Sequence, residues 1–288
     1  MDFIFEQITN WLKELLVGGI MNNLSGVFDS VNKEVEDVAV QLGTSPVNFS
    51  PEVYSMIRNI SESVIIPVAG MILTFIACCE LIQMVIDHNN LANFETWVFF
   101  KWVFKTFVAV ILISNTFNIT MGVFDLAQHV ISESSDIVSE STVVDYAMRD
   151  ELKDKLMEKD LGTLFLTFLN SFVLHITLTA VSIIVFVIIY GRMIEIYLMV
   201  SLAPVPFSTF GNREQSQMGQ NYLRSLLALG FQGFLLIVCV GIYAMMIKGV
   251  AVDDDVIASI WSVVGYTVLL CFTLFKTGSI TKSVFNAH

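Results

Sequence analysis

The sequence predicts an all-α, polytopic integral membrane protein with about five to six transmembrane helices and an N-terminal amphipathic helical region. A helix needs about 20 mostly apolar residues to cross the hydrocarbon core, and five windows reach that length: 63–86, 97–121, 161–190, 226–247 and 256–275. Hydrophobic residues make up 55% of the chain, and the mean hydropathy is +0.71. Ordinary soluble domains contain about 45–50% apolar residues. The composition therefore argues against a soluble protein.

Residues 1–50 are predicted to form an amphipathic helical region followed by a connector. Apolar residues recur every three or four positions, opposite Glu, Asp, Lys and Asn. This pattern is too polar for a membrane span, and it fits an in-plane interfacial helix or a subunit contact. Its near-heptad spacing favours contact between helices, and a helix folded back on the protein's own membrane domain is an equally open interpretation. The turn-rich residues 43–51 then lead into the membrane domain.

The rest of the chain divides into three predicted regions. Residues 51–121 are expected to form a transmembrane hairpin, and 122–160 a large acidic loop that includes a solvated helix. Residues 161–288 are expected to form a transmembrane bundle with a proline-broken segment at 193–210. The net charge is −12, and the acidic residues concentrate in the loop and at Asp253–Asp255. Such a chain is not built to hold nucleic-acid phosphates by itself.

Two topologies remain open from the sequence. If 193–210 enters and leaves the membrane on one side, five crossings put most basic residues near the spans on that side, which is then cytoplasmic. The acidic loop and the N-terminal helix would lie outside the cell membrane. A sixth crossing would instead place both termini and the loop inside. In the topology with five crossings, the basic residues on the cytoplasmic side are Lys101, Lys105, Arg192, Arg213, Arg224, Lys276 and Lys282.

Five charged residues are expected at membrane depth: Glu80, Lys101, Lys105, Arg192 and Glu195. A charge at the centre of a spanning helix costs about 2.5–3.5 kcal/mol on insertion scales, so each needs a partner or water. Glu80 lies near the end of one span and the two lysines near the start of the next. An ion pair from Glu80 to Lys101 or Lys105 is therefore expected, and snorkelling of the lysines to the headgroups is the alternative.

A polar stripe runs along the third span. Its members recur at intervals of three or four residues, and they are Thr163, Thr167, Ser171, His175, Thr179 and Ser182. Lipid disfavours such a stripe, so it is expected to face other helices or a water-filled passage. Hydrogen bonding between helices is the simpler interpretation, and lining a passage is the functional one.

The segment after this span contains Arg192, Glu195, Pro204 and Pro206. Proline removes a helical hydrogen bond and clashes with the preceding turn, so the helix is expected to bend or break there. The sequence contains no nucleophile paired with a base, no phosphate-binding glycine loop and no Cys/His spacing typical of a metal site. No enzyme activity, cofactor or metal is expected.

Four segments of the chain resemble a known family: 56–70 (MIRNISESVIIPVAG), 115–128 (NTFNITMGVFDLAQ), 192–214 (RMIEIYLMVSLAPVPFSTFGNRE) and 221–234 (NYLRSLLALGFQGF). They are similar to the TrbL-like conjugal transfer membrane proteins, the polytopic channel subunits of type IV secretion systems, especially those of Gram-positive conjugative elements. The likeness extends from about residue 51 to the C-terminus. It also favours the topology with five crossings and an extracytoplasmic acidic loop.

This resemblance implies a bacterial cell-membrane subunit that forms a homo-oligomer beside the ATPases and other membrane proteins of the conjugation machine. Relaxase-bound single-stranded DNA would be the substrate that passes. An independent transporter or ion channel is the alternative function, and it should depend on His175, Glu80 or Glu195. A scaffold that anchors partners through residues 1–43 is a third possibility.

Overall fold

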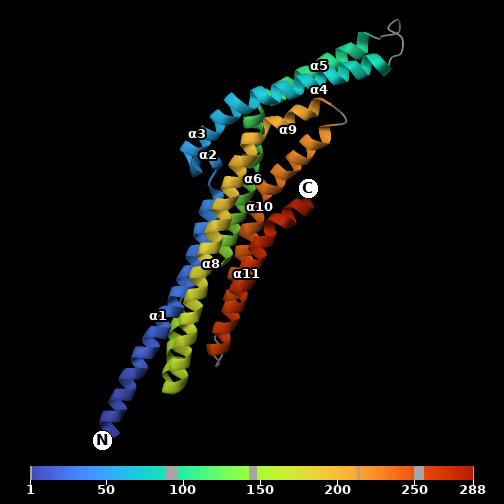
Figure 1. Cartoon of the computed structure of the whole chain (residues 1–288). Coiled ribbons are helices and arrows are strands. Elements are labelled where there is room, and N and C mark those ends of the chain that lie inside the picture. Colours follow the sequence, from blue (N-terminus) through green and yellow to red (C-terminus); the bar gives the residue numbers. More distant parts are fainter. Residues whose placement is uncertain (1, 88–95, 143–147, 213–214, 250–255, 288) are drawn as a thin grey trace. The chain divides into compact units, whose positions relative to one another are not determined.

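The computed structural model describes residues 2–87, 96–142, 148–212, 215–249 and 256–287 (Figure 1). Every regular element in these ranges is helical, which confirms the predicted all-α class. Among the described residues, five helical segments are long and apolar enough to cross a membrane: Pro51–Ile86, Trp97–Ser114, Leu161–Gly211, Ser216–Lys248 and Ile257–Val284. The predicted windows 161–190 and 193–210 thus belong to one candidate spanning segment, Leu161–Gly211. The aspartates at 253–255 lie outside the described residues.

The chain divides into two compact units. Unit 1 comprises Met1–Gly43, Ile131–Ile189 and Leu235–Thr277, and unit 2 comprises Thr44–Val130, Tyr190–Phe234 and Gly278–His288. Four helices contribute residues to both units: α6 (Thr116–Thr142), α8 (Leu161–Leu202), α10 (Ser216–Lys248) and α11 (Val256–Val284). The units are described separately below.

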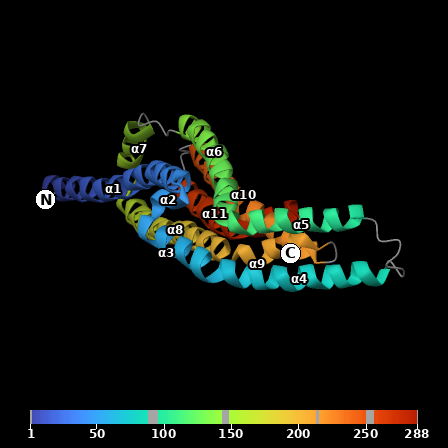
Figure 2. The ribbon, with the colours of Figure 1, turned by 90° about the horizontal axis from the view of Figure 1, so that it is seen from above.

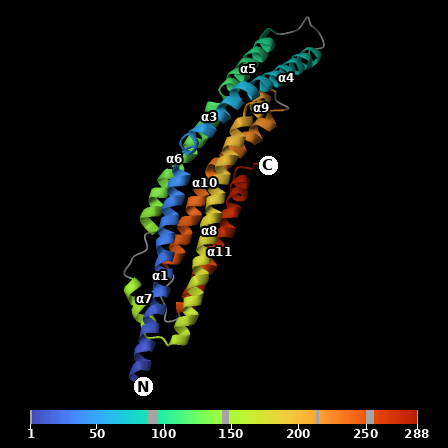
Figure 3. The same cartoon turned by 60° about the vertical axis from the view of Figure 1, so that its left-hand side comes forward.

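In unit 1, the N-terminal helix α1 (Asp2–Gly43) packs against α7 (Met148–Met157) and α8, as Figures 1 and 3 show. Gly19 of α1 lies so close to Phe168 that a Cβ atom at this position would be 2.7 Å from its ring. Four residues later, the Asn23 amide donates a hydrogen bond of 2.9 Å to Ser171 Oγ. The described part of α1 therefore contacts helices of its own chain, one of the arrangements that the sequence left open.

The buried face of α8 in unit 1 follows a regular seam. Up to Val185 its residues are spaced alternately by three and four positions, and Ile189 follows four positions later; the members are Leu164, Thr167, Ser171, Leu174, Leu178, Val181, Val185 and Ile189. This average spacing of 3.5 residues is that of a coiled-coil contact, which keeps one face of a helix against its neighbours. Two hydroxyl residues thus lie in an otherwise apolar seam.

Asp160 caps the start of α8. Its carboxylate accepts one hydrogen bond from the Thr163 N–H (3.0 Å) and one from the Thr163 hydroxyl (2.6 Å). A side-chain oxygen at this position satisfies N–H groups that have no partner within the helix. The same hydrogen bonds favour the ionised carboxylate and hold the pKa of Asp160 below its usual value.

Unit 2 contains a helical hairpin formed by α4 (Ile66–Asp87) and α5 (Thr96–Ser114), which lie side by side with α9 (Pro204–Ser208) against them in Figures 1 and 2. The short helix η3 (Thr209–Gly211) contacts both hairpin helices. The small core between them is apolar, and its buried members are Ala69, Leu73, Ala109, Ile113 and Phe207. The two helices were predicted as a hairpin, but α9 was not expected within its packing.

A second core in unit 2 joins α3 (Pro51–Ile60), α6, α8 and α10. Its largest buried side chains are Ile57, Phe117, Met121, Phe124, Met193, Ile196, Tyr197, Leu226 and Leu229. The short helix α2 (Pro46–Phe49) contacts the same helix α8, because the Tyr197 hydroxyl donates a hydrogen bond of 2.6 Å to the Pro46 carbonyl. The segments 51–130 and 190–234 therefore share one core, although they are distant in sequence.

The predicted span 97–121 is divided by a break at Asn115, between α5 and α6. The backbone hydrogen bonds from Asn115 N–H to the Ile111 carbonyl (3.1 Å) and from Ile119 N–H to the Asn115 carbonyl (3.0 Å) remain. Side chains also bond to carbonyls of the same turn: Asn115 Nδ2 donates to the Ile111 carbonyl (2.9 Å), and Thr116 Oγ1 donates to the Leu112 carbonyl (2.8 Å). Such side chains compete with the helical backbone for its carbonyl groups. The run Ser114–Asn115–Thr116 was the sequence signal for this break.

Most of the acidic region 122–160 is helical, whereas we expected a large loop with only part of it in a helix. The rest of α6 and the whole of α7 fall in this region, and residues 143–147 lie outside the described ones. The polar half of α6 also has a buried side, on which Ile131 and Ser135 lie. An amphipathic helix of this kind is stabilised by packing that acidic composition alone does not reveal.

A π-helical turn, η1 (Ser61–Ile65), connects α3 to α4. Pro67 has no backbone N–H, so it cannot donate to the carbonyl of residue 63. At the end of the turn, the Ile66 N–H instead donates five residues back, to the Ser61 carbonyl. This wider turn is the local consequence of a proline placed early in α4.

Candidate functional site

The hairpin of unit 2 contains an ion pair of the expected kind, in the second half of α4 and at the middle of α5. Lys105 Nζ of α5 pairs with Glu80 Oε1 of α4, and both side chains are partly buried. Opposite charges at one depth compensate each other where lipid disfavours an isolated charge. This pair therefore links two membrane-spanning segments. It gives two of the five predicted intramembrane charges a partner of opposite charge.

Lys101 does not join this pair. Its ammonium group lies 5.7 Å from the centre of the Trp97 ring, and its side chain is exposed. This distance is typical of a cation–π contact. One turn from the ion pair, the Trp102 indole N–H donates a hydrogen bond of 3.2 Å to the Ala77 carbonyl of α4. The hairpin is thus connected by both an ion pair and a side chain to backbone hydrogen bond.

Among the described cations of unit 2, Arg192 is the most deeply buried, with 5% of its surface exposed. Its Nε donates to the Leu229 carbonyl (3.2 Å), and its Nη2 donates to the Gly230 carbonyl (3.1 Å) of α10. The planar guanidinium presents several donors in a fixed geometry, which suits two adjacent carbonyls. Arg192 therefore connects α8 to α10 through backbone acceptors instead of a carboxylate.

Gly230, which accepts from this arginine, is also in close contact with α6. A Cβ atom on Gly230 would lie 3.1 Å from the Cβ of Ala127. Small residues permit this close approach of helix backbones. Glu195, one turn after Arg192, lies on the exposed side of α8. The sequence placed these two charges together, but the structure directs only Arg192 into the helix packing.

The helix break occurs where the two prolines stand: α8 ends at Leu202 and α9 begins at Pro204. Because Pro204 has no N–H, the Val200 carbonyl accepts instead from the Ala203 N–H, at 3.3 Å. That N–H would otherwise have bonded to the Met199 carbonyl in a regular helix. The Tyr222 hydroxyl of α10 donates to this remaining carbonyl at 2.6 Å. Tyr222 therefore caps the broken end of α8.

Tyr222 also packs against both apolar cores of unit 2. We expect Tyr222→Phe to keep this packing and to destabilise the protein by about 1–3 kcal/mol, since a buried carbonyl loses its partner. Thermal unfolding of the detergent-solubilised protein measures the change. Tyr266→Phe, in α11, is the matched control and should leave the midpoint unchanged. Equal midpoints for wild type and Tyr222→Phe would contradict the proposed cap.

The polar stripe of α8 changes its environment along the helix. Thr167 and Ser171 are buried in the seam of unit 1, whereas His175 and Thr179 are exposed and Ser182 is partly exposed. Each step of four residues rotates by about 40° more than one full helical turn. Residues spaced by four therefore move progressively away from a helix face whose members are spaced by 3.5 residues on average. The stripe therefore contributes to helix packing at its start, and further along it lies beside the seam on the surface of the single chain.

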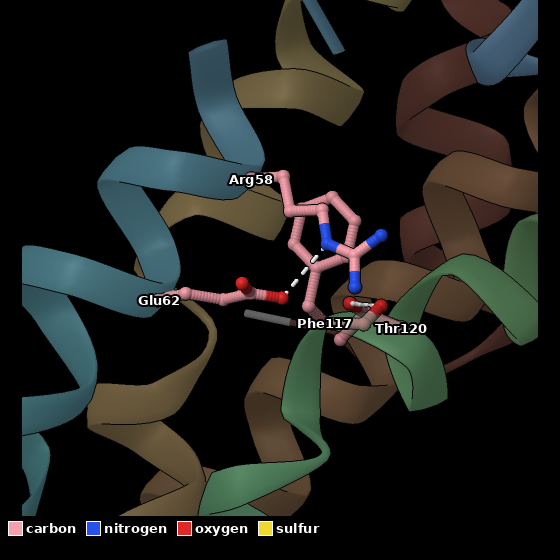
Figure 4. A network of polar contacts seen from close by, with 4 residues as sticks. All are labelled: Arg58, Glu62, Phe117 and Thr120. Carbon is pink, nitrogen blue, oxygen red and sulfur yellow. Dashed lines mark hydrogen bonds and ion pairs between the residues drawn. The ribbon is translucent and has the colours of Figure 1, made fainter. Parts of the chain in front are cut away.

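A polar cluster that sequence reasoning did not identify lies at the start of unit 2 (Figure 4). Arg58 of α3 forms an ion pair of 2.8 Å with Glu62, and its guanidinium lies 5.7 Å from the centre of the Phe117 ring of α6. Thr120 is fully buried next to this aromatic residue and donates to the Thr116 carbonyl. The Arg–x3–Glu spacing was the available signal, because it is a common helical ion pair.

These features define a polytopic α-helical membrane protein with intramembrane polar contacts and a proline-broken span. The model of the family described as TrbL/VirB6 plasmid conjugal transfer like protein matches residues 31–204, more than half of the chain. The chain therefore belongs to the TrbL/VirB6 conjugal transfer family. No curated protein and no solved structure gives a significant match.

Family membership makes the chain a multi-pass membrane subunit of a conjugal transfer, or type IV secretion, system. Family members are structural subunits that interact with other components of that machinery, and they are not known enzymes. In the described part of the chain, no three His, Cys, Asp or Glu residues are grouped so that they could hold a metal ion.

Proposed function

We propose that this chain is a non-enzymatic channel or scaffold subunit that supports passage of relaxase-bound single-stranded DNA across the donor cell membrane. The family match carries this proposal. The ATPases of the same machine would supply the energy, and this chain would form part of the membrane path. Its net charge of −12 is compatible with this role, because tight binding of phosphates would stall a moving strand.

The exposed part of the α8 stripe supports a role in lining the passage. His175 and Thr179 lie within the long apolar stretch of the third span, and both side chains are exposed on the single chain. The Thr179 hydroxyl donates to the His175 carbonyl (3.0 Å) and is satisfied within the helix. The imidazole of His175 is unfavourable against lipid, so this side chain requires water or another protein surface. Several copies of the chain, arranged around a common axis, would provide such a surface. The proposal therefore includes a homo-oligomer.

Transfer of the mobile element from a donor that lacks only this reading frame tests the proposed function. We expect transfer to fall to the background level and to recover when an intact copy is supplied in trans. Unchanged transfer in the deletion strain, with all other components present, would contradict the proposal. Flux through vesicles containing the purified chain alone would then support the alternative of an independent transporter or channel.

A further inference from the structure

The N-terminal helix α1 runs in the same direction as the spanning helix α8 (Figure 1). Gly19 of α1 lies beside Phe168 of α8, because an added Cβ atom would be 2.7 Å from the ring. Further along both helices, the Asn23 amide donates to Ser171 Oγ at 2.9 Å. From the first contact to the second, α1 advances by four residues and α8 by three. The two helices are therefore parallel, with matching levels along their length.

The other end of α8 is also connected to the chain that leaves α1. The Tyr197 hydroxyl donates to the Pro46 carbonyl, three residues after α1 ends at Gly43. Ser171 and Tyr197 are 26 residues apart on one continuous helix, which is about 39 Å of helix. From Asn23 to Gly43, α1 stays helical for about 30 Å. This length equals the thickness of the hydrocarbon core, which is about 30 Å.

The membrane crossing of α8 falls along this shared length. Residues 161–191 contain no Asp, Glu, Lys or Arg, whereas Asp160 precedes the stretch and Arg192 follows it. A crossing needs about 20 mostly apolar residues, so part of α1 lies beside any crossing within this stretch. Yet α1 is not among the candidate spans of the described chain, and the side chains of Glu36 and Asp37 near its end are exposed. A polar helix therefore accompanies an apolar one.

The level of these carboxylates on α8 determines what can surround them. Counted from the contact between Asn23 and Ser171, Glu36 lies at the level of about residue 184, inside the uncharged stretch. Charged groups at membrane depth are unfavourable against lipid and face a water-filled space instead. We propose that α1 crosses the membrane beside α8, with the side that carries Glu36 and Asp37 facing water inside the assembled machine. The source of this water is the passage proposed above, so the water-facing part of the inference rests on that function.

The sides of the membrane on which three positions lie test the crossing. Asn10 lies nine residues before Gly19, and Glu158 lies ten before Phe168, so both belong to the same end of α8. Val47 lies at the other end, next to the residue that bonds to α8. Asn10→Cys, Val47→Cys and Glu158→Cys are made in the full chain with its four native cysteines replaced by alanine. All three positions are exposed.

A membrane-impermeant maleimide is added to right-side-out and to inside-out vesicles from donor cells that contain the complete machine. We expect positions 10 and 158 to be labelled from one side of the membrane and position 47 from the opposite side. Position 158 is the matched control, because it reports the end of α8 from which α1 starts. Labelling of positions 10 and 47 from the same side would overturn the crossing.

Reaction with a small charged methanethiosulfonate tests the contact with water. A thiol reacts as its thiolate, and burial in an apolar medium disfavours that form. Glu36→Cys and Ile183→Cys place the thiol at about the same level, and Ile183 is 61% exposed on α8. We expect the reaction at position 36 to be severalfold faster than at position 183. Slow reaction at both would contradict contact with water, and equally fast reaction at both would contradict membrane depth. Neither measurement uses DNA, so the deletion strain tests the proposed function separately.

Discussion

Replacing Arg192 with methionine is expected to preserve the fold and to lower DNA transfer strongly. The two hydrogen bonds from the guanidinium contribute about 1.5–3 kcal/mol each, but burying the charge costs several kcal/mol, so the net contribution to stability is small. Methionine fills a similar volume, whereas Arg192→Ala leaves a cavity and should destabilise by about 2–5 kcal/mol. Transfer should fall with methionine because the crossing of α8 and α10 loses its polar connection to Leu229 and Gly230.

The two variants separate stability from function. Thermal unfolding of the purified protein should place Arg192→Met close to wild type and Arg192→Ala well below it, and transfer frequency is measured in the same strains. Membrane levels of the methionine variant should match wild type. Normal transfer with Arg192→Met would contradict a functional role for the guanidinium. Strong destabilisation by methionine would instead show that its hydrogen bonds exceed the cost of desolvation.

Gly219→Ala is expected to disrupt the packing around the broken span. A Cβ atom at this position would lie 2.8 Å from the Pro206 carbonyl oxygen and 3.0 Å from the Phe210 ring. The Gly219 N–H also donates to Thr209 Oγ1 at 3.2 Å, so the start of α10 is held against α9 and η3. A backbone carbonyl cannot rotate away as a side chain can. Overpacking of this kind typically costs about 1–3 kcal/mol.

Gly122→Ala is the matched control for this substitution. Gly122 also lies in a helix of unit 2, but no atom is within 4 Å of its added Cβ. Alanine has the higher helix propensity, by about 1 kcal/mol, so this variant should be at least as stable as wild type. Thermal unfolding and transfer frequency are measured for both. Equal behaviour of the two alanine variants would show that the contact at Gly219 does not limit the packing.

The sequence was sufficient to predict the fold class because long apolar windows have few alternatives to helices in a membrane. The first and last residues of the helices could be predicted less well from the sequence. Window 97–121 contained the break at Asn115, which depends on local hydrogen bonds and not on hydropathy. Windows 161–190 and 193–210 form one span because Gly191 and Arg192 remain helical. The helix α6 was missed because its stability comes from packing of one face.

The candidate site could be predicted as residue types, but not as contacts. Hydropathy identified Glu80, Lys105 and Arg192 as charges that require partners. The hairpin geometry explains the pairing of the first two, whereas the carbonyl partners of Arg192 cannot be read from side-chain patterns. Similarly, Pro204 indicated a break but not the capping by Tyr222. The hydrogen-bond partner of a backbone carbonyl at a helix break can be identified only when the position of the neighbouring helix is known.

Photocrosslinking of transferring DNA to α8 tests most directly whether this chain lines the passage. A photoreactive amino acid replaces either Thr179 or Ala180, two exposed neighbours that differ by about 100° around the helix. Both donors are illuminated during mating, and the transferred strand is quantified after denaturing purification of the protein. We predict recovery of the strand with the probe at position 179, little at 180 and none without the relaxase. Equal recovery at both positions, or none at either while transfer continues, would contradict the account.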